Sequence, residues 1–94
     1  MAEQKVLHVE VTEDMLACNV GSGLLRVLAT PTLCALFEQA ASQLAQTLVD
    51  EGQTTVGASL QIDHLAPTPL GGHVTVTAEL VEHEGRKFAF NLHA

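Results

Sequence analysis

The feature that most constrains the fold of this chain is a helical stripe of apolar residues in its first half. Over residues 31–50, apolar side chains recur every three or four residues, the period of one face of an α-helix. The stripe consists of Leu33, Leu36, Phe37, Ala40, Leu44 and Leu48. Thr30 is a favourable N-cap, Pro31 suits the first helical position, and Gly52 is a suitable stop. The sequence therefore predicts one long amphipathic helix over residues 31–50.

Alternating apolar and polar residues predict strands on both sides of this helix. Residues 5–11 alternate before it, and residues 54–64, 73–83 and 87–94 alternate after it. In the first run after the helix, one face carries Val56, Ala58, Leu60, Ile62 and His64. A proline-containing break precedes the second run, and residues 84–86 make a short hairpin turn. This order predicts an α+β fold in which one helix covers an antiparallel sheet.

Length and composition favour a single domain, residues 1–94, that assembles with copies of itself. The chain has 94 residues, of which 47% are hydrophobic, yet it contains three Phe and neither Trp nor Tyr. A domain this small and apolar gains stability when a partner covers surface that one chain cannot bury. We therefore expect a homodimer or a higher homo-oligomer.

Charge and motif content exclude several classes of protein. A net charge of −7 with four Lys and Arg argues against nucleic-acid binding and against docking on anionic membranes. No apolar run approaches the roughly 18 residues of a membrane span, and the N-terminus lacks the pattern of a signal peptide. Cys18 and Cys34 do not resemble a disulfide framework, and the histidines lack the spacing of a metal site. We expect a cytoplasmic protein without a metal.

One charged residue does not fit the pattern of the helix. Glu38 falls about 100° from the centre of the apolar stripe, on a flank shared with Cys34, Ala41 and Ala45. Because these three neighbours are small and mostly apolar, the flank is predicted to be covered, with Glu38 near an interface. The simpler alternative is an ordinary solvated position.

Three segments resemble the fluoroacetyl-CoA thioesterase-like family of hot-dog-fold proteins. They are GSGLLRVLATPTLCALFEQAA (21–41), EGQTTVGASLQIDHLAPTPLGGHVTVTAEL (51–80) and EGRKFAF (84–90). The resemblance implies a long central helix wrapped by an antiparallel sheet, and a dimer with its sites at the subunit interface. It also implies hydrolysis of a small acyl-CoA thioester without a cofactor, coenzyme A being part of the substrate.

The resemblance carries four site residues onto this chain. Thr30, Glu38 and His64 match the family's catalytic threonine, glutamate and histidine, and Gly57 matches a glycine associated with the substrate carbonyl. Thioester hydrolysis needs a base, an activated nucleophile and donors for the oxyanion. We assign His64 as base, Glu38 as its carboxylate partner or water activator, and Thr30 as the hydroxyl near the scissile carbon. Each also has a simpler interpretation: helix cap for Thr30, solvated residue for Glu38, and hydrogen-bonded core or edge residue for His64.

The sequence departs from the family at its C-terminal end. Family members continue with a further hairpin and a final strand, so we expect a sheet that is one strand short and has an exposed edge. A non-catalytic hot-dog domain that binds acyl-CoA or a protein partner is therefore an alternative, and a hot-dog hydratase or dehydratase is a third. Arg86 and Lys87 are either contacts for the phosphates of coenzyme A or part of a solvated hairpin.

Overall fold

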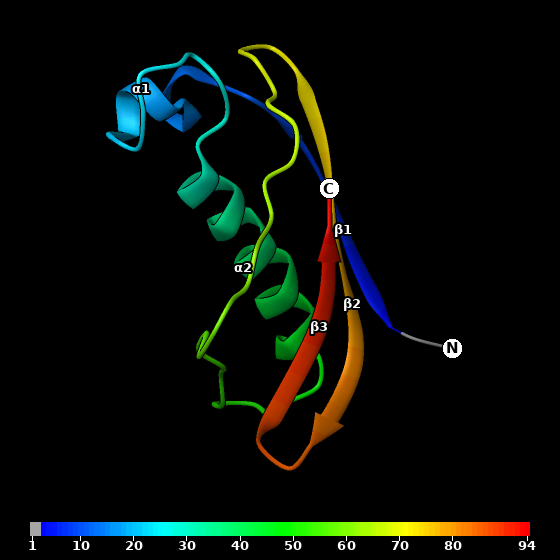
Figure 1. Ribbon diagram of the computed structural model, residues 1–94. Coiled ribbons are helices and arrows are strands. Elements are labelled where there is room, and N and C mark those ends of the chain that lie inside the picture. Colours follow the sequence, from blue (N-terminus) through cyan, green and yellow to red (C-terminus); the bar gives the residue numbers. More distant parts are fainter. Residues whose placement is uncertain (1–2) are drawn as a thin grey trace.

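One long helix packs against an antiparallel sheet in a computed structural model that describes residues 3–94 (Figure 1). The elements in chain order are β1 (Gln4–Glu10), the 3₁₀ helix η1 (Glu13–Met15), α1 (Ala17–Val20), α2 (Thr30–Gln46), β2 (His73–Glu84) and β3 (Lys87–His93). Within the described residues, no helix is both long enough and apolar enough to cross a membrane. The predicted arrangement, one helix on one antiparallel sheet, is thus observed.

The helix α2 forms where the apolar stripe predicted it, and the stripe faces the sheet. Leu33, Phe37, Ala40 and Leu44 are buried, and Pro31 lies in the first turn, where its missing N–H breaks no hydrogen bond. These residues join the sheet in one core. Its members are Val11, Leu16, Leu28, Leu33, Phe37, Ala40, Val74, Val76 and Ala78.

The two ends of α2 differ from the prediction. The N-cap is Ala29, and Thr30 is the first helical residue, so the predicted cap is wrong. The helix ends at Gln46, earlier than expected, because the hydroxyl of Thr47 at 2.7 Å and its N–H at 3.1 Å both donate to the Leu44 carbonyl and so occupy an acceptor of the last turn. Gly52 does adopt a left-handed φ of 87°, but in the turn after the helix.

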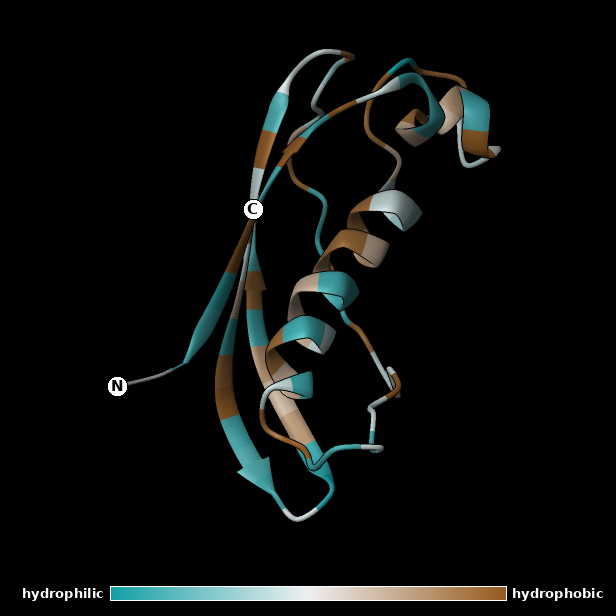
Figure 2. Ribbon diagram, turned by 180° about the vertical axis from the view of Figure 1, so that it is seen from behind, coloured by the Kyte–Doolittle hydropathy of each residue, from teal (hydrophilic) through white to brown (hydrophobic). Residues whose placement is uncertain are grey.

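The sheet has the order β1-β2-β3, with both pairs antiparallel. Leu7 pairs with Val76, and Ala78 pairs with Leu92, so that the inward side chains form one apolar face against α2. A two-residue turn containing Gly85, at φ 59°, joins β2 to β3 as predicted, and the tip of this hairpin is hydrophilic (Figure 2). Within residues 3–94, β3 has no strand on its outer side, as expected from the sequence.

The stretch 54–66 is extended but is not a strand, which corrects the prediction for residues 54–64. It runs back along α2 (Figure 1), and within the described residues its backbone makes no ladder hydrogen bond. Only its second half keeps the predicted alternation, since Ile62 and His64 are half-buried while Val56 is 88% exposed. A strand requires a hydrogen-bonded neighbour, and alternation alone does not supply one.

The molecule is elongated and exposes much surface for its mass. Its extents are 42 × 25 × 22 Å, and its radius of gyration is 14.3 Å, against about 12 Å for a compact chain of this length. It exposes 6476 Å², whereas about 5,200 Å² is usual for a folded monomer of 10.0 kDa. Strongly exposed apolar side chains contribute to this excess. They include Leu24, Leu25, Val56 and Leu65.

Candidate active site

Thr30 and His64 form a hydrogen-bonded pair at the start of α2. The Thr30 Oγ1 and His64 Nδ1 atoms lie 2.7 Å apart, with Thr30 exposed and His64 half-buried. Because Ala29 occupies the N-cap position and no side chain caps the helix, the Thr30 hydroxyl is available to the imidazole. A hydroxyl that donates to a neutral imidazole nitrogen has a base in place to accept its proton.

Backbone donors lie beside this pair. The first helical hydrogen bond of α2 runs from the Leu33 N–H to the Ala29 carbonyl at 2.9 Å. The amides of Thr30 and Thr32 precede it, in the turn where N–H groups have no helical partner. Such amides point toward the helix N-terminus and stabilise a negative charge there. The pair therefore has donors for an oxyanion within the same turn.

A pocket of about 450 Å³ opens beside Thr30 and His64. Its other walls come mostly from apolar residues of the loop before α2 and from the proline-containing break after the extended stretch. They include Leu24, Leu25, Val27 and Pro67. A second cavity of about 570 Å³ also reaches His64 and lies over Leu33, Phe37 and Ile62. The His64 imidazole thus borders two cavities, one beside the loop before α2 and one above the core.

Glu38 and Gly57 form a second contact farther along the helix. A Cβ atom on Gly57 would collide with Oε2 of Glu38 and would lie 3.5 Å from its Cδ atom, so the carboxylate rests against the glycine backbone. Glu38 is exposed, and within residues 3–94 its carboxylate has no hydrogen-bond or ion-pair partner. Eight residues of helix, about 12 Å along the axis, separate it from Thr30.

The four predicted site residues therefore lie along one line of contact between α2 and the extended stretch. Thr30 meets His64 at one end of this line, and Glu38 meets Gly57 toward the other. The structure brings the residues together in these two pairs, but it does not join Glu38 to His64 by a hydrogen bond. Among the described residues, no group of three His, Cys, Asp or Glu side chains is arranged to hold a metal ion.

The sequence interpretation missed the pocket wall formed by the loop before α2. Leu24 is 95% exposed and Leu25 is 69% exposed, although both line the pocket beside His64. The loop also carries Arg26, which pairs with Glu13. Two adjacent leucines after a Gly-Ser-Gly turn were the available signal, but no periodicity links such a loop to a site.

Comparison with known proteins decides the family. Residues 11–94 match the family model described as fluoroacetyl-CoA-specific thioesterase (FlK). The chain belongs to this family. The resemblance noted in the sequence is thereby confirmed, and the family model covers all four predicted site residues.

Individual members of the FlK family show how far the similarity extends. A fluoroacetyl-CoA thioesterase of Streptantibioticus cattleyicolor is 35% identical over 68 residues, which are 72% of this chain and 49% of that protein. This chain therefore spans about half the length of its curated relative. A crystal structure of an FlK mutant with fluoroacetate and CoA superposes with a TM-score of 0.90 at 26% identity, over 98% of this chain and 78% of that one.

A more distant structure confirms the fold alone. A hypothetical protein of Thermus thermophilus, a thioesterase superfamily member, superposes with a TM-score of 0.87 at 23% identity, over 97% of this chain and 67% of that chain. Together with the long helix on an antiparallel sheet, these superpositions confirm the predicted hot-dog fold of the α+β class.

Proposed function

We propose that this chain is a thioesterase that hydrolyses a small acyl-CoA thioester at a site between two copies of the chain. The observation that carries the proposal is the 2.7 Å contact between the Thr30 hydroxyl and the His64 imidazole at an apolar pocket. The names of the relatives, fluoroacetyl-CoA thioesterases, support the substrate class.

The chemistry follows from the groups at the helix start. His64 accepts a proton from the Thr30 hydroxyl or from a water molecule, and the oxygen so activated attacks the thioester carbonyl. The amides of the first turn of α2 stabilise the tetrahedral oxyanion. The C–S bond then breaks, and the imidazolium returns its proton to the leaving thiolate, which gives the coenzyme A thiol. Where water attacks, the other product is the carboxylic acid. Where Thr30 attacks, it is an ester of Thr30, which a water molecule activated by His64 hydrolyses to the carboxylic acid with release of the Thr30 hydroxyl. No metal or redox cofactor enters this reaction.

Glu38 has the role of the carboxylate in this site, as partner of His64 or as activator of the water. Its position about 12 Å along the helix from Thr30 does not suit direct contact with His64 of the same chain. Its exposed carboxylate against Gly57, beside a backbone without ladder partners, suits an interface that a second copy completes. We therefore place the working site in a homodimer or higher homo-oligomer.

The test is thiol release from a panel of acyl-CoAs, including acetyl-CoA, fluoroacetyl-CoA and an aromatic acyl-CoA. We expect turnover by the wild type and a loss of about 100-fold or more in His64→Ala, the range associated with a general base. His83→Ala is the matched control, because His83 stacks on Phe88 in the hairpin, with ring centroids 4.0 Å apart, and does not line the pocket.

Two outcomes would contradict the proposal. Equal hydrolysis by wild type and His64→Ala would remove His64 from the reaction. Absence of turnover in a folded oligomer that binds acyl-CoA would favour the alternative, a non-catalytic domain of the same family.

A further inference from the structure

The loop between α1 and α2 builds one wall of the pocket and is attached through a side chain that faces away from it. Leu25 and Val27 line the cavity beside Thr30 and His64, whereas Arg26, between them, does not. The Arg26 guanidinium instead contacts Glu13 of η1. Leu25 and Val27 thus line the pocket, and Arg26 between them attaches the loop to η1.

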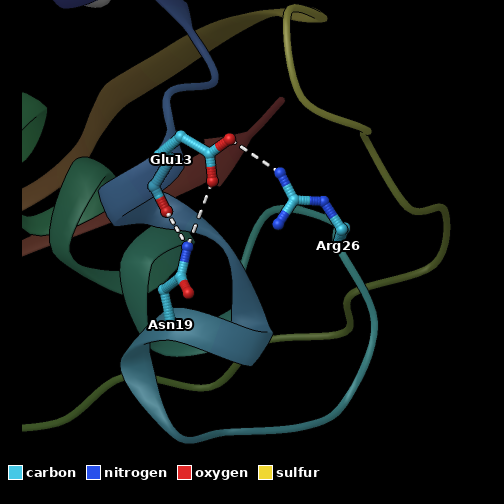
Figure 3. Close-up of polar contacts among 3 residues, drawn as sticks. All are labelled: Glu13, Asn19 and Arg26. Carbon is cyan, nitrogen blue, oxygen red and sulfur yellow. Dashed lines mark hydrogen bonds and ion pairs between the residues drawn. The ribbon is translucent and has the colours of Figure 1, made fainter.

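The attachment is a three-residue polar cluster (Figure 3). Arg26 Nη2 donates to Glu13 Oε1 at 2.7 Å. Asn19 Nδ2 donates to the Glu13 backbone carbonyl at 2.7 Å and lies 3.3 Å from Glu13 Oε2. Asn19 of α1 therefore contacts both the backbone and the carboxylate of Glu13, and Arg26 contacts the same carboxylate.

Two backbone hydrogen bonds to α1 also hold residues 25–27. The Leu25 carbonyl accepts from the Cys18 N–H at 3.2 Å, and the Val27 carbonyl accepts from the Ala17 N–H at 2.8 Å. Loss of the Arg26 contact would leave two hydrogen bonds, the longer of which holds Leu25. The exposed end of the wall, at Leu24 and Leu25, is thus the part that depends most on Arg26.

The ion pair between Arg26 and Glu13 is expected to affect the position of the loop and not the stability of the whole domain. The side chains of Arg26 and Glu13 are 58% and 60% exposed, and an ion pair this exposed contributes little to global stability. Its hydrogen bond to Glu13, with the charge of that carboxylate, raises the pKa of Arg26 above its ordinary value, so the guanidinium remains charged. A short, charge-assisted hydrogen bond between two surface segments favours one relative position of these segments.

We propose that Glu13 and Arg26 are a positioning pair that holds the pocket wall at Leu25 and Val27 beside Thr30 and His64, and so sets which acyl groups the pocket accepts. This inference rests on the proposed thioesterase function. Neither residue touches the reacting atoms. Their effect falls on the fit of the acyl group and therefore on KM, while the Thr30–His64 pair on α2 and the extended stretch keeps its geometry.

The test measures kcat and KM for a short and a long acyl-CoA in Glu13→Gln, Arg26→Gln and the exchanged pair Glu13→Arg with Arg26→Glu. We expect each single variant to raise KM about five-fold for the acyl group that the wild type prefers, with kcat within about two-fold. The exchanged pair should return KM to within about two-fold of wild type. Lys5→Gln, which removes a cation from β1 at a position that lines neither pocket, is the control and should leave KM unchanged.

Amide hydrogen exchange supplies a readout that does not need turnover. The amides of Ala17 and Cys18 donate to the wall carbonyls, so exchange at Cys18 should accelerate about five-fold or more in both single variants and return in the exchanged pair. Unchanged Cys18 exchange together with unchanged KM would overturn the positioning role. No thiol release by the wild type would contradict the proposed function instead, and Cys18 exchange would then decide the positioning role alone.

Discussion

At the scale of single residues, the hydrogen bond of the Thr30 hydroxyl separates the two interpretations of this residue, helix cap and site residue. Thr30 begins α2 yet makes no capping hydrogen bond, and its oxygen faces the His64 ring instead. Thr47, at the other end of α2, donates to the Leu44 carbonyl. The two threonines therefore make different kinds of hydrogen bond on the same helix.

We predict that Thr30→Val changes the free energy of unfolding by at most about 0.5 kcal/mol, because water replaces the lost partner of an exposed hydrogen bond. Thr47→Val should cost about 1 kcal/mol, since the Leu44 carbonyl loses the hydroxyl donor at 2.7 Å and keeps only the Thr47 N–H at 3.1 Å. Denaturant unfolding of both variants checks this. A loss of about 1–2 kcal/mol for Thr30→Val would indicate a capping role after all.

Gly57 permits the close approach of the Glu38 carboxylate. We predict that Gly57→Ala displaces this carboxylate, because the new Cβ would collide with Oε2 of Glu38. The Glu38 side chain is flexible at that end, so the unfolding free energy should change by less than about 1 kcal/mol while kcat/KM falls about ten-fold or more. Ser59→Ala, in the same exposed stretch, is the control. Retained kcat/KM in Gly57→Ala would contradict a role for this contact.

At the scale of elements, the extended stretch 54–66 differs from the strands of the sheet. It lies along α2 and contributes Gly57 and His64 to the two contact pairs, but within the described residues it has no ladder. Strand β2 pairs on both sides and carries the buried Val74, Val76 and Ala78. The candidate site thus lies between a helix packed on the core and a stretch whose backbone has no ladder partner within the described residues.

We predict that amides 55–65 exchange at least about 100-fold faster than those of Val76 and Ala78 in the dilute protein, because unpaired backbone needs no opening. Raising the protein concentration should slow exchange in the stretch if a second copy covers it. Residue-resolved exchange at two concentrations makes the comparison. Equal protection of the stretch and β2 at both concentrations would show that it already has a ladder.

Local pattern predicted the long helix and the three strands that pair in the sheet. The stripe of Leu33, Phe37 and Ala40 placed α2, and alternation placed β1, β2 and β3. Alternation failed over 54–64 because a strand also requires a neighbouring backbone at hydrogen-bond distance.

The candidate site was only partly readable from the sequence. The family resemblance singled out Thr30 and His64, and their contact lies outside what spacing alone reveals, because 34 positions separate them. The pair of Glu13 and Arg26 joins two irregular segments, where no periodic signal exists. The end of α2 was missed because the Thr47 side chain competed with helical hydrogen bonding.

At the scale of the whole molecule, shape and exposed surface are the features that support the proposed self-association. The exposed area of 6476 Å² exceeds that of a typical monomer of this mass by about 1,200 Å², an area comparable with that buried in a small stable interface. Val56 and Leu65, both in the extended stretch, are 88% and 91% exposed.

We predict a dimer or larger assembly by sedimentation at about 50 μM protein. Val56→Glu and Leu65→Glu should each weaken assembly about ten-fold or more, because a charge enters the covered face. Val81→Glu, at a position 50% exposed on β2, should leave it unchanged. A monomeric wild type with full thioesterase activity would contradict a site shared between copies.

The most direct test of the central claim is a double-mutant cycle on Thr30 and His64, with kcat/KM measured for the best acyl-CoA in wild type, Thr30→Val, His64→Gln and the double variant. If the 2.7 Å pair acts as one catalytic unit, each single variant should lose about as much activity as both together. Thr32→Val, in the same turn of α2, should retain activity. Losses that simply multiply, or single variants with wild-type activity, would contradict the claim.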